Sequence, residues 1–91
     1  MKLEIIPSNQ FKKDLKLAQK RGLALAELTA VISALANGEA LDPKFRDHTL
    51  IGDYNGFREC HIRPDWLLIY KIDNGQLLLF LARTGSHSDL F

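Results

Sequence analysis

The run from Trp66 to Ile72 constrains the fold most, because it is almost wholly apolar. Such a strand suits the centre of a sheet that is covered on both faces. An Arg-Pro-Asp turn at 63–65 precedes it, and residues 57–62 before that turn alternate. Asp-Asn-Gly at 73–75 predicts a second hairpin, because Asn-Gly supplies the positive φ values of a two-residue turn. We therefore predict consecutive antiparallel strands at about 55–62, 66–72 and 76–82.

The first third of the chain predicts one strand and two helices. Residues 3–6 are a short strand candidate that Pro7 closes, and Ser8 is an N-cap for the following helix. Apolar residues recur at helical spacing from 9 to 21 and again from about 24 to 36. About two residues separate these segments, which predicts an antiparallel helical hairpin.

The predicted order β-α-α-β-β-β defines an α+β domain. The helical hairpin is expected to cover one face of a mainly antiparallel four-stranded sheet. Ninety-one residues suffice for one domain, 1–91, with one modest core. Since the strands are apolar on both faces, we expect the second face to be partly open or covered by a partner. Residues 39–52 show little periodicity and are interpreted as a loop that carries Asp47 and His48 across the domain.

The charge distribution restricts nucleic-acid binding to a local surface. The net charge is +1, so no global field attracts nucleic acid. Residues 9–21 nevertheless hold five basic residues and one acidic residue, a local net charge of +4. The basic residues are Lys12, Lys13, Lys16, Lys20 and Arg21. They form a candidate RNA-binding face, although a merely solvated helix face explains them as well.

Cysteine usage and hydropathy indicate a cytoplasmic location. The single cysteine, Cys60, excludes an internal disulfide and fits a reducing compartment. Its place in an alternating strand favours a small buried residue over a nucleophile. No apolar run approaches the roughly 20 residues that span a bilayer, and the charged N-terminal segment is too short for a signal peptide. We therefore expect no membrane partner.

One group of polar residues resembles a catalytic set. Hairpin geometry is expected to bring its members to one end of the sheet, with Arg83 level with Asp65 near the start of the 66–72 strand. The set consists of His48, His61, Asp65, Arg83 and His87. The set contains the groups needed to cleave RNA through attack by the 2′-OH of the RNA itself: a base, an acid, and a cation for the charge that develops on the phosphate. Histidine titrates near neutral pH, and arginine binds phosphate bidentately.

Each member of the set also has a plainer interpretation. Asp65 suits a turn, and Arg83 can pair with a carboxylate. A lone histidine on a surface commonly has no function, and Phe91 can be a frayed end. Three histidines and an aspartate could ligate zinc, but no two histidines lie at i, i+4 on a helix and no cysteine pair exists. A metal site is therefore not predicted.

Several sequence blocks carry a resemblance to a known family. They are Asp47-His48-x-Leu50-x-Gly52, then Gly56-Phe57-Arg58-Glu59-x-His61-Ile62-x-Pro64-Asp65-Trp66-Leu67-Leu68-Ile69-Tyr70, then Arg83-Thr84-Gly85-x-His87 and a terminal Leu90-Phe91. With the run from Lys16 to Arg21, they resemble the YafQ branch of the RelE/ParE toxin superfamily. The resemblance covers nearly the whole chain.

The resemblance implies a fold, an activity and a set of roles. It implies a small RelE-like domain, similar to microbial ribonucleases, that cuts mRNA in the ribosomal A site and is neutralised by a cognate antitoxin. The residues matching the family's acid–base set are His48, His61, Asp65 and His87. Arg83 matches the phosphate-binding arginine, and Phe91 matches the C-terminal aromatic residue that helps to position the message. Which histidine is base and which is acid stays open.

We therefore expect a metal-independent endoribonuclease that needs no cofactor. Its products would carry a 2′,3′-cyclic phosphate and a 5′-OH. The expected partners are the antitoxin, mRNA and the ribosome, with the basic helix on ribosomal RNA; operator DNA is expected only for the toxin–antitoxin complex. Two rivals remain: a non-catalytic ParE-like inhibitor of a topoisomerase, and a plain nucleic-acid-binding module. Neither has a chemical need for the His/Asp set.

Overall fold

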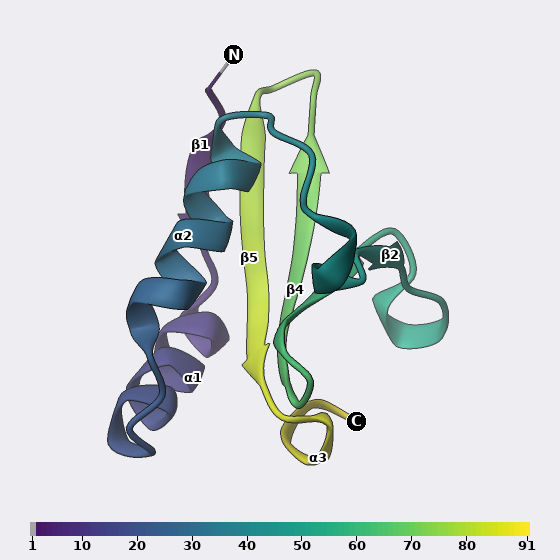
Figure 1. The fold of residues 1–91 in the computed structure, drawn as a ribbon. Helices are drawn as coiled ribbons and strands as arrows, with labels where there is room; N and C mark the ends of the chain where they lie inside the picture. Colours follow the sequence, from purple (N-terminus) through teal and green to yellow (C-terminus); the bar gives the residue numbers. More distant parts are fainter. Residues whose placement is uncertain (1) are drawn as a thin grey trace.

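The computed structural model describes residues 2–91. Its elements in chain order are β1 (Glu4–Pro7), α1 (Asn9–Lys20), α2 (Leu25–Ala36), the 3₁₀ turn η1 (Pro43–Phe45), β2 (His48–Thr49), the 3₁₀ turn η2 (Gly52–Tyr54), β3 (Arg58–Arg63), β4 (Trp66–Asp73), β5 (Leu78–Gly85) and α3 (His87–Leu90). The domain is therefore α+β, as predicted (Figure 1).

The sheet has five strands instead of the predicted four. Its order is β1-β5-β4-β3-β2, with β1 parallel to β5 and the other neighbours antiparallel. The added strand, β2, lies inside the segment that we interpret from sequence as a loop. Two residues are too few to display a side-chain period, so only pairing with β3 defines this strand.

The second hairpin forms where predicted, but its turn is longer. Asp73 pairs with Leu78, so residues 74–77 make a four-residue loop instead of a two-residue turn. The residue with positive φ is Leu77, at 58°, and not the Asn-Gly pair. The Asp73 carboxylate accepts the backbone N–H of Gln76 at 3.1 Å. This side-chain bond closes the turn in place of the tighter backbone geometry.

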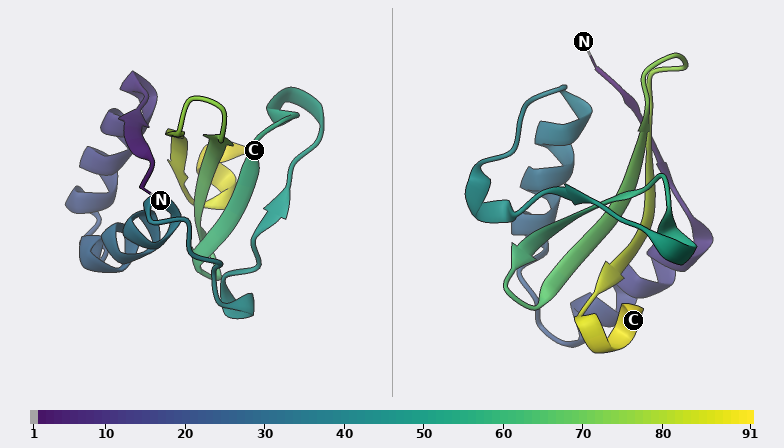
Figure 2. Two further views of the ribbon diagram at one scale, coloured as in Figure 1. Left: turned by 90° about the horizontal axis from the view of Figure 1, so that it is seen from above. Right: turned by 90° about the vertical axis from the view of Figure 1, so that its right-hand side faces the viewer.

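The two helices cover one face of the sheet, as Figure 2 shows. α1 starts where predicted, because the Ser8 hydroxyl accepts the N–H of Phe11 at 2.9 Å. It ends at Lys20, with Arg21 as the C-cap, and Gly22 follows with a φ of 74°, which suits the residue after the cap. None of the helices within residues 2–91 has the length and apolar character needed to cross a membrane.

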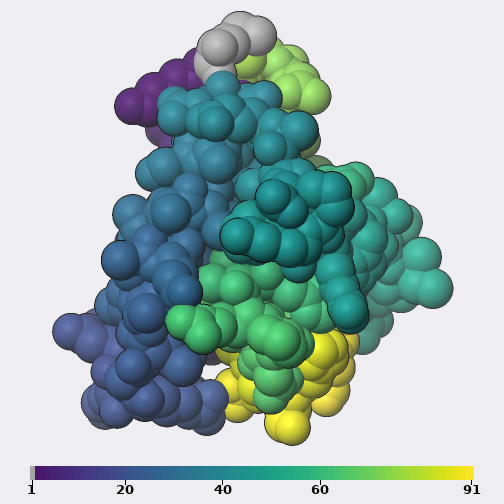
Figure 3. Space-filling view, viewed as in Figure 1, coloured from purple at the N-terminus to yellow at the C-terminus, as the bar shows by residue number. Residues whose placement is uncertain are grey.

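The main core lies between the helices and this face of the sheet. It is made of Leu3, Phe11, Leu28, Val31, Leu35, Ala36, Cys60, Ile62, Trp66, Leu68, Tyr70, Leu79 and Leu81. The segment from Leu41 to Phe45 packs along its margin and continues the surface of α2 (Figure 3). Strands β3, β4 and β5 all contribute side chains, so this core fixes the sheet that carries the site.

The second face of the sheet is partly covered by the chain itself. Leu67 and Ile69 of β4 form a small cluster there with Leu90 of α3. The residues packed around them are Leu50, Tyr54, Phe57 and Ala82. Figure 2 shows the 50–57 segment on the side of the sheet opposite the helices. From sequence we expect this face to be partly open or covered by a partner, and the structure shows that a loop and a terminal helix of the chain itself shield its middle.

Candidate active site

Strand β3 presents two polar side chains to the second face. Glu59 and His61 point to this face, while Cys60 and Ile62 between them belong to the main core, as the alternation predicts. Glu59 is only 4% exposed, and the His61 side chain is 13% exposed. Burial raises the pKa of the Cys60 thiol to about 12, so this cysteine is no nucleophile at neutral pH.

Strand β2 carries His48 to the same place. Its pairing with β3 sets His48 directly opposite Glu59. The preceding residue, Asp47, is fixed by the Tyr70 hydroxyl at 2.5 Å and by two bonds of 3.2 Å from Arg58. Burial and the bond to Asp47 raise the pKa of Tyr70, which stays a hydrogen-bond donor. A short strand with little pairing is thus held by a polar anchor from the sheet.

Glu59 lies between two imidazoles. Its Oε1 is 3.4 Å from Nε2 of His48 and 3.4 Å from Nε2 of His61. The Nδ1 atoms of these histidines face backbone carbonyls, of Arg46 at 2.7 Å and of Pro64 at 3.2 Å. A carbonyl can only accept, so both Nδ1 atoms carry hydrogen. If both imidazoles are neutral, the lone pairs of their Nε2 atoms face the carboxylate, and a positive charge placed among the three groups would relieve this repulsion.

That charge can be a proton or a metal ion. The ligand atoms of His48, Glu59 and His61 all lie within 4.8 Å of one another, close enough to share an ion. Two imidazole nitrogens and one carboxylate oxygen are ordinary zinc ligands. The metal hypothesis from sequence grouped the three histidines with Asp65 and did not include Glu59, because the pairing of β2 with β3 is not visible in the sequence.

Helix α3 supplies the other half of the site. Its first residue, His87, donates its backbone N–H to Asp65 Oδ1 at 3.0 Å, and its Nδ1 lies 2.9 Å from the same oxygen. These bonds lower the pKa of Asp65. The ring of His61 lies between the other two, with centroids 5.8 Å from His87 and 6.1 Å from His48. The structure therefore brings together the three histidines and Asp65, while their roles stay predictions.

Arg83 lies elsewhere than predicted. It pairs across β4–β5 with Ile69, in one row with Glu59, and is not level with Asp65. Compared with a two-residue turn, the four-residue loop 74–77 shifts the register by two positions, and an irregularity beside Ile69 shifts it by one more. Its guanidinium bonds to Asp14 at 2.8 and 3.2 Å, and this bond is the main cause of its raised pKa. The plainer interpretation, pairing with a carboxylate, is confirmed.

Aromatic residues border the site near Arg83. Phe91 is 64% exposed, and its ring lies edge-on to Tyr54, with 5.9 Å between centroids. The Tyr54 hydroxyl lies beside Arg83 and contributes to its raised pKa. Tyr54 and Glu59 are the two site residues that sequence reasoning missed. The signal for Glu59 was present, since alternation places it on the same face as His61.

The basic residues of α1 fall into two groups. Lys12, Lys13, Lys16 and Lys20 are exposed, and within residues 2–91 none of them forms an ion pair. Arg21, by contrast, bonds to both carboxylate oxygens of Asp89 at 2.6 and 3.2 Å. Arg21 therefore differs from the lysines in having a carboxylate partner in α3, while RNA binding by all five residues stays a prediction.

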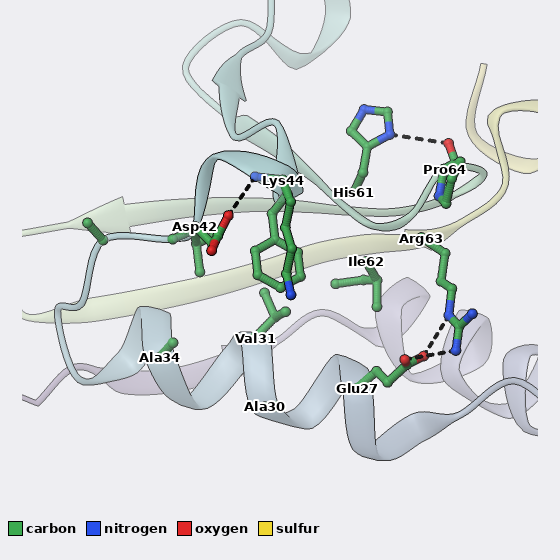
Figure 4. A pocket seen from close by; sticks show the side chains of 13 residues that line it. Glu27, Ala30, Val31, Ala34, Asp42, Lys44, His61, Ile62, Arg63 and Pro64 are labelled. Carbon is green, nitrogen blue, oxygen red and sulfur yellow. Dashed lines mark hydrogen bonds and ion pairs between the residues drawn. The ribbon is translucent and has the colours of Figure 1, made fainter.

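A separate hollow lies on the helix side of β3. It has a volume of about 630 Å³ and runs between α2 and β3, past Val31 and Ile62. Figure 4 shows the ion pair between Glu27 and Arg63 at one end. The ring of His61 points away from this hollow toward Pro64. His61 therefore borders the hollow, while its ring belongs to the histidine cluster on the other face of β3.

The molecule is thus a small α+β domain that gathers three histidines and two carboxylates on one face of its sheet. Residues 3–91 match the family described as a bacterial toxin of type II toxin–antitoxin systems, YafQ. The mRNA interferase toxin YafQ of Escherichia coli K12 is 42% identical over 85 residues, which are 92% of this chain and 90% of the relative. The chain therefore belongs to the YafQ toxin family.

Solved structures agree with this assignment. A metal-bound toxin from Helicobacter pylori is 48% identical, with a TM-score of 0.92 over 98% of this chain and 99% of that one. The YafQ chain of the E. coli DinJ–YafQ toxin–antitoxin complex is 40% identical, with a TM-score of 0.90 over 100% and 99%. The recognised family and the mixed α+β fold are thus confirmed.

Proposed function

We propose that this protein is a ribosome-dependent endoribonuclease toxin that cleaves mRNA in the ribosomal A site. The observation that carries the proposal is the cluster of three neighbouring histidines, in which Glu59 contacts His48 and His61 and Asp65 contacts His87. A topoisomerase inhibitor or a plain RNA-binding module would not need imidazoles of fixed orientation. The relative from E. coli is named an mRNA interferase, which supports the catalytic alternative.

In the cluster, one pair of residues suits the base and another pair suits the acid of 2′-OH attack. His61 donates Nδ1–H to a carbonyl and keeps Nε2 beside Glu59, so these two residues suit the base that takes the hydroxyl proton. His87 is bonded to Asp65 through Nδ1, which stabilises an imidazolium and leaves Nε2 free to protonate the 5′-oxygen. Attack of the 2′-oxygen on phosphorus then breaks the bond to that oxygen, giving a 2′,3′-cyclic phosphate and a 5′-OH.

The remaining residues would stabilise charge and hold the message. His48, opposite Glu59, supports the positive charge of the trio. Arg83 retains guanidinium N–H groups beyond the Nε and Nη2 used by Asp14, and these can meet a phosphate beside Tyr54. The exposed ring of Phe91 suits stacking on a base of the message. The four α1 lysines would bind ribosomal RNA, so the working compartment is the cytoplasm.

Cleavage on this scheme needs no metal. A metal ion held by His48, Glu59 and His61 would occupy the Nε2 lone pairs that a base requires, so it would inhibit the reaction. The metal-bound H. pylori toxin makes this point worth testing directly. Treatment with a chelator should leave cleavage unchanged, and zinc should abolish it in proportion to its occupancy. If cleavage is lost in the chelator and recovers when zinc is added, the reaction requires a metal ion, and the metal-independent scheme is wrong.

The protein should also have a cognate antitoxin, as the E. coli relative has DinJ. Exposed apolar side chains flank the site, with Ile51 88% exposed in addition to Phe91. Such side chains suit a partner that covers the site face. Hydrogen exchange of the complex should show protection at 57–65 and 83–91. Protection confined to 24–36 would mean that the antitoxin blocks ribosome access and leaves the active site uncovered.

The decisive experiment compares cleavage on and off the ribosome. Wild type should cut a programmed mRNA in the A site, leave a cyclic phosphate, and cut the naked transcript poorly, because the ribosome holds the message in a reactive geometry. His61→Ala should lower the rate by about 10²-fold or more at unchanged ribosome binding. Full activity of this variant would contradict the proposal, and efficient ribosome-free cleavage would indicate a general ribonuclease.

A further inference from the structure

Helix α3 has a single turn, so it depends on contacts outside itself. A four-residue helix has too few internal bonds to be stable alone. Ser86 and Asp89 form a capping box, and Leu90 packs into the small apolar cluster beside Leu67. The orientation of this turn decides where His87 and Phe91 lie, because both residues are attached to it.

Arg21 bridges α3 to α1. It donates to Asp89 Oδ2 at 2.6 Å and to Oδ1 at 3.2 Å, across 68 positions of sequence. Asp89 Oδ2 also accepts the backbone N–H of Ser86 at 3.0 Å, so one carboxylate serves both the bridge and the cap. This combination lowers the pKa of Asp89, chiefly through the bond to Arg21. The orientation of the Asp89 carboxylate is therefore fixed by two kinds of bond, one to the backbone at the start of α3 and one to Arg21 at the end of α1.

Gly85 leaves the room that this carboxylate needs. A Cβ at Gly85 would lie 3.0 Å from both Cβ and Oδ2 of Asp89. Real Cβ atoms at that distance force their neighbours to move, and the φ of 158° adds strain for a residue with a side chain. The close approach of Gly85 and the reach of Arg21 thus act on the same atoms from opposite sides.

We propose that Arg21 and Asp89 are positioning residues, which hold α3 so that His87 faces Asp65 and the reacting phosphate. Arg21 then acts through Asp89 on the chemical step, in contrast to the α1 lysines, which act on ribosome binding. This inference rests on the proposed endoribonuclease function. It assigns to one arginine of the basic helix a role different from that of its neighbours.

The test separates the rate at saturating ribosomes from ribosome affinity. Arg21→Gln should lower the saturated single-turnover rate by about tenfold, below the roughly hundredfold that a 1 Å misplacement can cost. The ribosome concentration at half saturation should change little. Arg21→Lys should recover part of the rate, because an ammonium can bond one carboxylate oxygen. Gly85→Ala, which displaces Asp89 without touching Arg21, should lower the same rate.

A second readout uses the free protein. The amides of His87, Leu90 and Phe91 bond within α3 or to Asp65, and their hydrogen exchange should quicken about two- to five-fold in Arg21→Gln, as expected for loss of an exposed ion pair. Glu27→Gln is the matched control, because it removes the comparable Glu27–Arg63 pair on α2 and leaves α3 alone. It should change neither exchange nor rate.

Two results would overturn the inference. If Arg21→Gln weakens ribosome affinity but leaves α3 exchange and the saturated rate unchanged, Arg21 is an RNA contact like the lysines. If it changes nothing, the bridge has no role. If wild type fails to cleave on the ribosome, the proposed function fails, and the exchange measurement still decides whether the bridge holds α3.

Discussion

The two faces of the sheet are built in different ways. The helix side buries a continuous apolar core from both long helices and three strands, β3 to β5. Among the apolar residues that the structure describes, the small cluster on the site side buries Leu67, Ile69 and Leu90. The short elements that carry site residues are tied by polar anchors: Asp47, which precedes β2, bonds to Tyr70 and Arg58, while α3 is held by the bonds of His87 to Asp65 and of Asp89 to Arg21. One face supplies stability, and the other supplies orientation.

This difference has a physical reason. Imidazoles that exchange protons must meet a substrate, so they cannot lie in a close-packed core. His61 lies on β3, which the main core holds from its other face, but β2 and α3 have only two and four residues and cannot be fixed by apolar burial alone. Charge-assisted bonds fix direction at partly exposed positions, where dispersion contacts are few. On the site face, hydrogen bonds of defined geometry therefore hold side chains in place where little apolar area is buried.

The largest expected effect is the loss of stability when a core residue on the helix side is truncated. Leu28 of α2 is 1% exposed and lies in the main core, on the helix side of the sheet. Leu28→Ala should lower the free energy of unfolding by about 2–5 kcal/mol, through lost transfer energy and a residual cavity. Denaturant unfolding measures this change, while the cleavage rate per folded molecule should stay the same. A loss below about 1 kcal/mol would mean that the helix face is not the main source of stability.

A change on the site side should lower the cleavage rate and leave the free energy of unfolding nearly unchanged. Glu59→Gln keeps the size of the side chain but removes the negative charge that faces two imidazoles, so cleavage should fall by about 10²-fold. Unfolding should change little. Glu39→Gln, at an exposed position beyond α2, is the control for charge alone. If both variants cleave equally well, Glu59 has no part in the proton transfer.

Sequence patterns predicted the helix side better than the site side. Strands β3 to β5 and both long helices follow from alternation, apolar runs and capping residues, because each depends on neighbours along the chain. The face shared by Glu59 and His61 follows from the same period. Such local patterns suffice where burial decides the structure.

The rest depended on contacts between distant residues. β2 is too short for a period, so the position of His48 beside Glu59 required the register of β3. The shift that moves Arg83 opposite Ile69 leaves no mark in the local sequence. The bond from Arg21 to Asp89 joins the first helix to the last. The short helix α3 did have a local signal, the Ser86-x-x-Asp89 capping box, which the sequence interpretation did not use.

The α1 lysines extend the comparison to a third surface, which needs neither burial nor anchoring. Changing Lys12, Lys13 and Lys16 to Glu should weaken ribosome binding and reduce the slope of log affinity against log salt by about 2, since each phosphate contact contributes about 0.7 for single-stranded RNA. The saturated cleavage rate should stay unchanged. Binding titrations from low to moderate salt give the slope. An unaltered slope would show that this face is only solvated.

The smallest expected effect uses acid to loosen one face before the other. Asp65 and Asp89 have pKa values lowered from the ordinary 3.8, by His87 and by Arg21 respectively. A carboxyl whose folded pKa is lowered stabilises the structure above its unfolded pKa, and this contribution is lost as the pH falls through the folded pKa. Contacts of α3 should therefore weaken only below about pH 4, while the main core contains no titrating carboxyl.

Amide exchange followed from pH 5 to pH 2 tests this order, after correction for the intrinsic pH dependence of exchange. The amides of α3 should lose protection first, and those of β4 in the helix-side core should keep theirs. Asp89→Asn should show weaker α3 protection at pH 5 and a smaller further loss in acid, because the variant has no carboxylate to protonate at that position. Simultaneous loss of protection on both faces would mean that the site side is not an independently opening unit. Polar anchors and apolar core would then belong to one cooperative structure.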